Sequence, residues 1–117
     1  MITSEVIEKF SALSGVSGEA LNKWSFLCED SIVAIRAKLR SWVNEEEHEY
    51  ILCAAAAALS YYKYVLCMLI RNEMDSDSEY AVNNSITKGI AQTVWMDYKG
   101  MISHLLVDDQ FTFIVTI

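Results

Sequence analysis

The sequence predicts an all-α fold: a four-helix bundle-like domain with a long central alanine-rich helix and a short C-terminal β segment. The 117 residues include no proline, so nothing interrupts long helices. Apolar residues recur at steps of three and four along most of the chain, which is the period of an amphipathic helix. The apolar fraction of 53 % is ample for a packed core. At this length we expect one helical domain over residues 1–117.

Two helices are expected in the first third of the chain. Thr3 is a plausible N-cap for a short helix that stops at Gly15. A second helix then begins after Ser17 and runs from Gly18 to Trp42, because an unbroken apolar row follows it at helical spacing. We expect this row to be buried. It consists of Leu21, Trp24, Cys28, Ile32, Ile35, Leu39 and Trp42.

The opposite side of this second helix carries a smaller apolar row. Phe26, Val33 and Ala37 recur at helical spacing among charged residues. Scattered apolar side chains are common on protein surfaces, but a row of them is also what a subunit contact requires. These residues are therefore candidates for an oligomer or partner interface.

The third helix, from Tyr50 to Ile70, is either the centre of the bundle or a membrane span. Its twenty-one residues contain one charge, Lys63, and that length would cross a bilayer. However, the alanines of residues 54–58 contribute little to insertion, and Lys63 would cost about 3 kcal/mol near the bilayer centre. We therefore expect the core helix of a soluble bundle, apolar except for one narrow polar line that faces water. The line consists of Glu49, Cys53, Ala56, Ser60, Lys63, Cys67 and Arg71.

A polar segment and a fourth helix follow. Residues 80–88 are expected to form a loop or a small hairpin, with a type I′ turn at Asn83-Asn84. The fourth helix is expected from Ile90 to Leu106. Its apolar face consists of Ile90, Val94, Tyr98, Met101 and Leu105.

The chain ends in "QFTFIVTI", which has the alternation of a β-strand with one apolar face. Phe111, Phe113, Val115 and Ile117 form that face and complete the set of candidate interface residues. A strand needs a partner, because its unpaired backbone groups would otherwise invite aggregation. Two partners are open: residues 80–87 of the same chain, or the edge of a neighbouring subunit.

The charge is acidic and unevenly distributed. The net charge is −7, and residues 44–84 hold eight acids against two bases, whereas residues 1–43 hold five of each. Such a chain lacks the basic footprint that independent or sequence-specific nucleic-acid binding requires.

Cysteine use and the N-terminus indicate an intracellular protein. Cys28, Cys53 and Cys67 are an odd number and form no C-x-x-C motif, so we expect reduced, buried side chains. "MITSEVIEKF" has neither the bases nor the apolar region of a signal peptide, which predicts synthesis in the cytoplasm without export.

The sequence offers little catalytic chemistry. Glu45 and His48 have the E-x-x-H spacing of di-iron bundles, but a second such pair is missing, and an acidic first turn suits the helix dipole. His104 is expected at a helix end. No phosphate-binding loop or catalytic triad is present. We therefore expect no enzyme activity and no catalytic, cofactor or metal-binding residues.

Several stretches together resemble the small helical head-tail connector proteins of tailed phages and prophages, which complete the head as adaptors. The resemblance runs from about Leu21 onward and consists of "WSFLCEDSIVAIRAKLR", "EEEHEYILCAAAAALSYYKYVL", the "SITKG" segment and the closing "ISHLLVDDQFTFIVTI". These are patterns of residue type. Members of the family are often richer in glycine around the loop, and residues 76–88 here have none.

The resemblance implies a structural virion protein. It would bind the portal, form a ring that extends the DNA channel, and receive tail or stopper proteins, without a membrane partner. The acidic middle third would line or rim that channel, since like charge suppresses phosphate contacts. The protein would reside in the virion, and in the bacterial cytoplasm during assembly. The alternative is a small cytoplasmic helical adaptor or regulatory protein that acts by binding other proteins.

Overall fold

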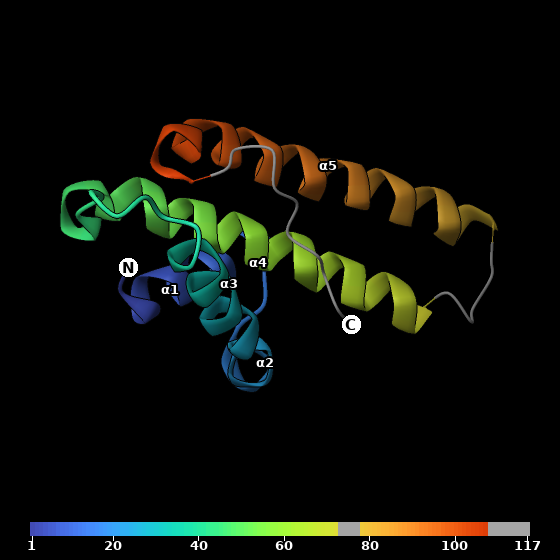
Figure 1. Cartoon of the computed structure of the whole chain (residues 1–117). Helices are drawn as coiled ribbons and strands as arrows, with labels where there is room; N and C mark the ends of the chain where they lie inside the picture. Colours follow the sequence, from blue (N-terminus) through green and yellow to red (C-terminus); the bar gives the residue numbers. More distant parts are fainter. Residues whose placement is uncertain (73–77, 108–117) are drawn as a thin grey trace.

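The fold is a helical bundle built around one long helix. The computed structural model describes residues 1–72 and 78–107, and the side chains of residues 1–71 and 86–107. The central helix α4 (Glu49–Asn72) lies antiparallel to α5 (Ser78–Ile102). Helices α1 (Thr3–Ser14), α2 (Gly18–Trp24) and α3 (Phe26–Arg36) lie on the other side of α4 (Figure 1). Short 3₁₀ turns precede α4 and follow α5, at Glu45–His48 (η1) and Ser103–Leu105 (η2). The all-α prediction is confirmed.

The first helix ends where the sequence predicted. Gly15 has a φ of 77°, the left-handed conformation that glycine adopts without strain, and its N–H donates to the Ser11 carbonyl at 2.9 Å. At the other end the N-cap is Ile2, one residue before the expected Thr3. Val6 and Phe10 are fully buried, and the Phe10 ring meets Tyr64 of α4 edge-on. This contact fixes α1 against the central helix.

The predicted single helix from Gly18 to Trp42 is wrong, because the chain forms two helices that meet at Ser25. The break lets both parts pack on α4. Trp24 at the end of α2 meets Tyr64 edge-on at 5.1 Å between ring centroids. Leu27 and Cys28 begin the buried face of α3. Periodicity alone did not reveal the change of direction, because the apolar spacing continues across it.

The second helix also ends earlier than predicted, at Arg36, because residues 38–40 pair with the end of the chain's described part. The Arg40 N–H donates to the Leu105 carbonyl and the Val107 N–H to the Lys38 carbonyl, both at 2.8 Å. Leu39 and Leu106 form an isolated antiparallel bridge. Trp42, expected in the buried row, is 63 % exposed as a result.

The α4 prediction of Tyr50 to Ile70 is confirmed within two residues at each end. Its alanines are buried on all sides, and Ala55 to Ala58 have no exposed surface. The prediction that the polar line of this helix faces water is wrong for its central residues. Cys53, Ala56 and Ser60 are fully buried. Ser60 Oγ lies 2.9 Å from Ser31 Oγ of α3 and 2.7 Å from the Ala56 carbonyl. The small residues of this line therefore face α1 and α3, which approach too closely for water.

The predicted loop or hairpin at residues 80–88 is wrong, because this segment lies inside α5. No glycine or proline occurs between residues 76 and 88, so nothing in the backbone breaks the helix. The fourth helix thus begins twelve residues before the expected Ile90 and ends at Ile102. Residues 80–87 are not available as a strand partner for the C-terminal segment.

The predicted apolar face of the fourth helix is confirmed for Val94, Tyr98 and Leu105, which pack on the core, but not for Ile90 and Met101. Ala91, Trp95 and Ile102 are buried, whereas Ile90 and Met101 are more than half exposed. Both rows have helical spacing, so the sequence pattern did not discriminate between them. The wide indole of Trp95 buries more apolar area than Ile90 would, which favours the observed face.

The stretch Glu45–Arg71 is long and apolar enough to cross a membrane by length and composition. In this fold 61 % of its most apolar window is buried inside the bundle. Core helices of soluble proteins have the same properties, so the sequence prediction of a soluble core helix stays a prediction.

Close packing at the alanines predicts a strong response to added volume. Ala56→Leu should lower the free energy of unfolding by about 1–3 kcal/mol, because the added methyls and methine meet Ala56's neighbours in a filled interior. Urea denaturation monitored by circular dichroism measures the change. Ala20→Leu on the exposed side of α2 is the matched control and should change stability by less than about 0.5 kcal/mol. Equal effects of the two substitutions would contradict the packing described above.

Candidate functional site

The first candidate surface is the outward side of α3. Phe26 and Val33 are exposed, Val33 to 65 %, and Ala37 follows at the C-cap of the helix. The structure therefore brings these predicted interface residues together on one side of the bundle, and we call them the α3 surface. Glu29 and Asp30 lie exposed among them, so the surface is apolar with an acidic border.

The other predicted interface residues, Phe111, Phe113, Val115 and Ile117, lie outside the described residues. The described part of the chain ends at Val107. Val107 follows the antiparallel bridge to Leu39. Val107 pairs with Lys38, which lies two residues after the end of α3 at Arg36.

A second apolar surface lies on α5, where the sequence analysis expected packing. Ile86, Ile90 and Met101 are each more than half exposed and fall within one quadrant of the helix. We call this the α5 surface. Asp97 lies on the same side of the helix. The two surfaces belong to helices on opposite sides of α4 (Figure 1).

A groove lies where α1, α4 and α5 meet. Its apolar part is a hollow of about 190 Å³ lined by Leu13, Tyr50, Tyr98 and two residues of the alanine run, Ala54 and Ala57. Ala54 and Ala57 lie beneath this hollow, and both are buried. Close packing of the helices requires small residues at these positions of α4. The same small residues leave space beside α1.

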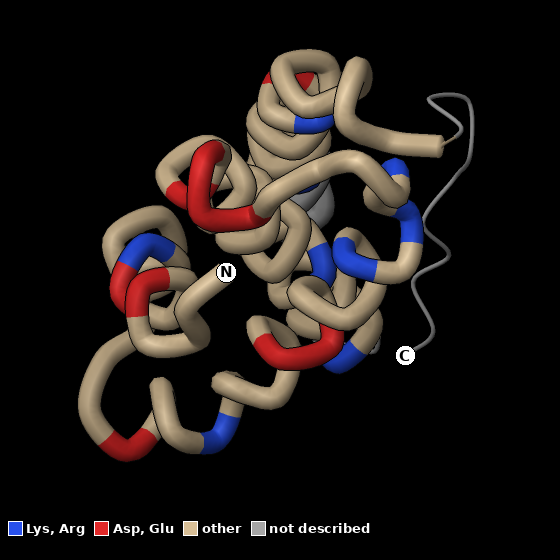
Figure 2. Tube along the Cα trace, turned by 60° about the vertical axis from the view of Figure 1, so that its left-hand side comes forward, with Lys and Arg blue, Asp and Glu red and all other residues tan. Residues whose placement is uncertain are grey.

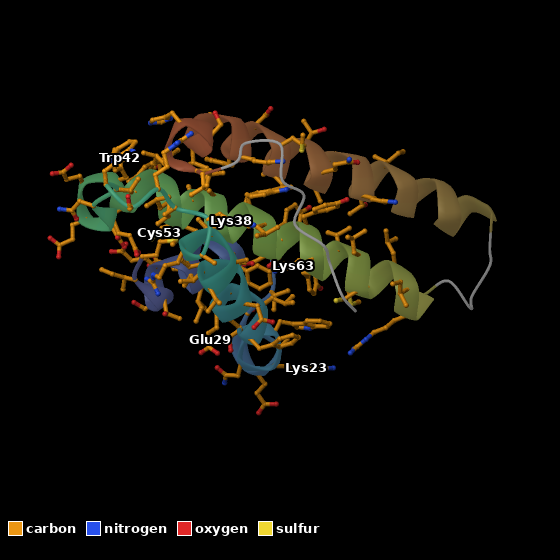
Figure 3. All side chains as sticks on the ribbon, viewed as in Figure 1. Lys23, Glu29, Lys38, Trp42, Cys53 and Lys63 are labelled. Atoms are coloured by element: carbon orange, nitrogen blue, oxygen red, sulfur yellow. The ribbon has the colours of Figure 1, made fainter. Side chains whose placement is uncertain are left out.

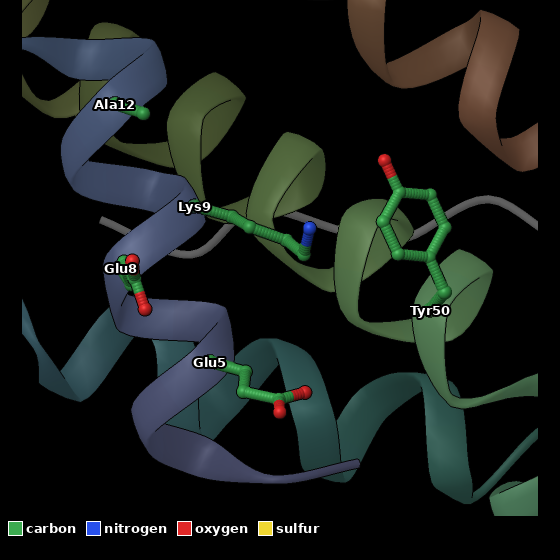
Figure 4. A pocket seen from close by; sticks show the side chains of 5 residues that line it. All are labelled: Glu5, Glu8, Lys9, Ala12 and Tyr50. Carbon is green, nitrogen blue, oxygen red and sulfur yellow. The ribbon is translucent and has the colours of Figure 1, made fainter.

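The groove continues into an acidic part. A second hollow of about 360 Å³ is lined by Glu5 and Glu8 and shares Lys9, Ala12 and Tyr50 with the first. Figure 4 shows Lys9 extending from α1 toward Tyr50, with Glu5 and Glu8 on the same helix. The ammonium lies 4.2 Å from the centre of the Tyr50 ring, a cation–π distance. The groove thus combines an apolar end with an acidic end, and sequence reasoning missed it because its residues come from three helices.

Glu45 and His48, the pair considered for metal binding, each contact a different partner. Arg36 donates two hydrogen bonds to Glu45, from Nε to Oε2 at 2.8 Å and from Nη2 to Oε1 at 2.9 Å. The amino group of Met1 lies 2.6 Å from the same Oε1. The hydrogen bonds from Arg36 lower the pKa of Glu45 from 4.5 to about 2. His48 lies beside His104 instead, with 6.4 Å between ring centroids.

One set of described residues has the composition of a metal site. Ligand atoms of Glu5, Glu49 and Cys53 lie within 4.8 Å of one another. Their hydrogen bonds are already assigned: Cys53 Sγ lies 3.1 Å from Glu49 Oε1, which also accepts from the Ile2 N–H at 2.7 Å. These contacts explain the cluster as an anchor of the N-terminal segment on α4.

The cysteines are buried, as the sequence predicted. Burial raises the pKa of the Cys28 thiol to about 11, and burial together with Glu49 does the same for Cys53 (Figure 3). Burial also raises the pKa of Cys67. Thiols that stay protonated at neutral pH are poor nucleophiles, so these side chains serve packing.

The Glu45 contacts predict a pH-dependent contribution to stability. Its pKa is lower in the folded chain, so the stabilisation is complete above pH 4.5 and is lost as the pH falls toward 2. Glu45→Gln should lower the free energy of unfolding by about 1 kcal/mol at pH 7, since Arg36 is half exposed. The difference from the unsubstituted protein should shrink between pH 4.5 and 2, measured by urea denaturation. Glu46→Gln is the control; a difference that persists at pH 2 would refute the assignment.

Comparisons with known proteins assign no relative: no protein-family model, no curated protein and no solved structure matches this chain. The candidate site therefore rests on the α3 surface, the α5 surface and the groove, and on the chemistry of their residues.

Proposed function

We propose that this protein is a structural component of a tailed phage or prophage, a head-tail connector that binds the portal and forms a ring extending the DNA channel. The observation that carries the proposal is the exposure of apolar side chains on unlike elements that lie on opposite sides of α4. The α3 surface and the α5 surface are the two main examples.

This arrangement is what a ring subunit needs. A ring is a heterologous assembly in which two different surfaces of each subunit meet, and a connector also binds the portal on one side and tail or stopper proteins on the other. Exposed apolar groups of this extent favour binding partners over free solution.

The distribution of acids refines the expected relation to DNA. Within the described side chains, the acids of residues 44–84 lie at the start of α4, at Glu45–Glu47 and Glu49, beside the N-terminus (Figure 2). Glu45 is partly neutralised by Arg36. Four acids at one end of α4 would suit an acidic rim to a channel, and the other four acids of residues 44–84 lie outside the described side chains.

Assembly on a portal tests the proposal. The unsubstituted protein, at high concentration and mixed with a portal protein from the same genome, should give a ring-sized complex in native mass spectrometry. Val33→Asp should weaken that complex by about tenfold or more, because a charge would be buried in an apolar contact. Met96→Asp, at an exposed site away from both surfaces, is the control.

Only monomer, with and without the portal, would refute the connector role. That result would leave the adaptor alternative, in which case the α3 surface should bind a protein that is not part of a virion. The genes adjacent to this one distinguish the same two readings, since a connector is encoded among portal and capsid genes.

A further inference from the structure

The groove between α1, α4 and α5 has an apolar part and an acidic part. A molecule that binds in it should therefore carry an apolar group beside a positively charged one. The apolar part is bordered by Leu13 and the rings of Tyr50 and Tyr98, the acidic part by Glu5 and Glu8, and Lys9 lines both parts. A fitting occupant presents an aromatic group next to a cation.

The described part of this chain presents that combination at the linker after α3. Trp42 is 63 % exposed, and Arg40, two residues earlier, is exposed with no ion-pair partner among the described residues. Figure 3 shows Trp42 at the end of the bundle where α4 begins. It does not line the groove of its own chain.

Backbone hydrogen bonds order the linker that carries both residues. The Arg40 N–H donates to the Leu105 carbonyl at 2.8 Å, and the Val43 N–H donates to the Arg40 carbonyl at 3.0 Å. These bonds lie on both sides of Trp42. An anchor that is already ordered loses less conformational entropy on binding, and tryptophan and arginine dominate the energetics of many interfaces.

The other exposed apolar surfaces match the groove poorly in charge. The α3 surface carries Glu29 and Asp30, and the α5 surface carries Asp97. Each would bring an acid toward Glu5 and Glu8, which outnumber the single cation Lys9 in the acidic part. Like charges across an interface select against such a partner.

We propose that the groove is a docking site for a second copy of this chain, whose Trp42 enters the apolar part while Arg40 pairs with Glu5 or Glu8 in the acidic part. The proposal rests on the proposed function and deepens it by naming the surfaces that join neighbouring subunits. The α3 surface and the α5 surface then remain for portal, tail or further subunit contacts.

Tryptophan fluorescence gives a direct readout. Of the three tryptophans, Trp24 and Trp95 are only 6 % and 4 % exposed, so quenching by acrylamide reports mainly on Trp42. As the concentration of the unsubstituted protein rises, self-association seen by sedimentation velocity should coincide with a blue shift and with protection of Trp42. Self-association without protection of Trp42, or no self-association up to millimolar concentration, would overturn the proposal.

Variants of each half of the contact test it further. Trp42→Ala removes the anchor and Ala12→Phe fills the groove from the exposed side of α1, so each should weaken self-association by about tenfold or more. Met96→Ala, which removes an equally exposed side chain elsewhere, should leave it unchanged. A mixture of the first two variants has one intact anchor and one intact groove, and should form a 1:1 complex that neither forms alone.

Charge exchange tests the pairing without changing apolar volume. Glu8→Arg and Arg40→Glu should each weaken self-association, and the double variant should recover part of it. If Trp42→Ala and Ala12→Phe both associate like the unsubstituted protein, the contact is refuted. A ring that Trp42→Ala still forms on the portal would refute this contact and leave the connector role standing, whereas absence of a ring for the unsubstituted protein would refute the connector role.

Discussion

The close approach of three helices to the alanine run of α4 is the constraint on which the rest of this structure depends. Ala55 to Ala58 have no exposed surface, although a helix of this length in a small bundle could leave one side open to water. Because each alanine extends only a methyl group, α1, α3 and α5 can all reach the same stretch of helix. The cost of this arrangement is that larger side chains on the neighbours must supply most of the buried apolar area.

That cost explains where the large residues lie. Phe10, Trp24 and Trp95 reach the core from α1, α2 and α5, and the first two meet Tyr64 of α4, which lies beyond the alanine run. Ser31 and Ser60 can share a hydrogen bond in the interior because their backbones are close. The same small residues leave the groove beside α1 unfilled, so the packing that stabilises the bundle also creates its best candidate for a docking site.

The candidate interaction surfaces follow from the competition for space around α4. Each outer helix has one face to bury but more apolar residues than that face holds. In α5 the row with Trp95 is buried, which leaves Ile86, Ile90 and Met101 outside. In the linker after α3, pairing of residues 38–40 with residues 105–107 places Leu39 inward and leaves Trp42 in solvent. The exposed apolar residues of this bundle are therefore those that the core has no space for, and they are available to bind partners.

The sequence by itself determined the helical class, the extent of α4, the stop at Gly15, the burial of the cysteines, and the exposure of Phe26 and Val33. These depend on local rules: helical period, absence of proline, and the conformational freedom of glycine. Only the tertiary structure decided the break at Ser25, the end of α3 at Arg36, the helical state of residues 80–87 and the buried face of α5. In each of these cases two local patterns were nearly equal, and contacts between residues far apart in the sequence selected one. The groove could not be predicted at all, because no single helix contains it.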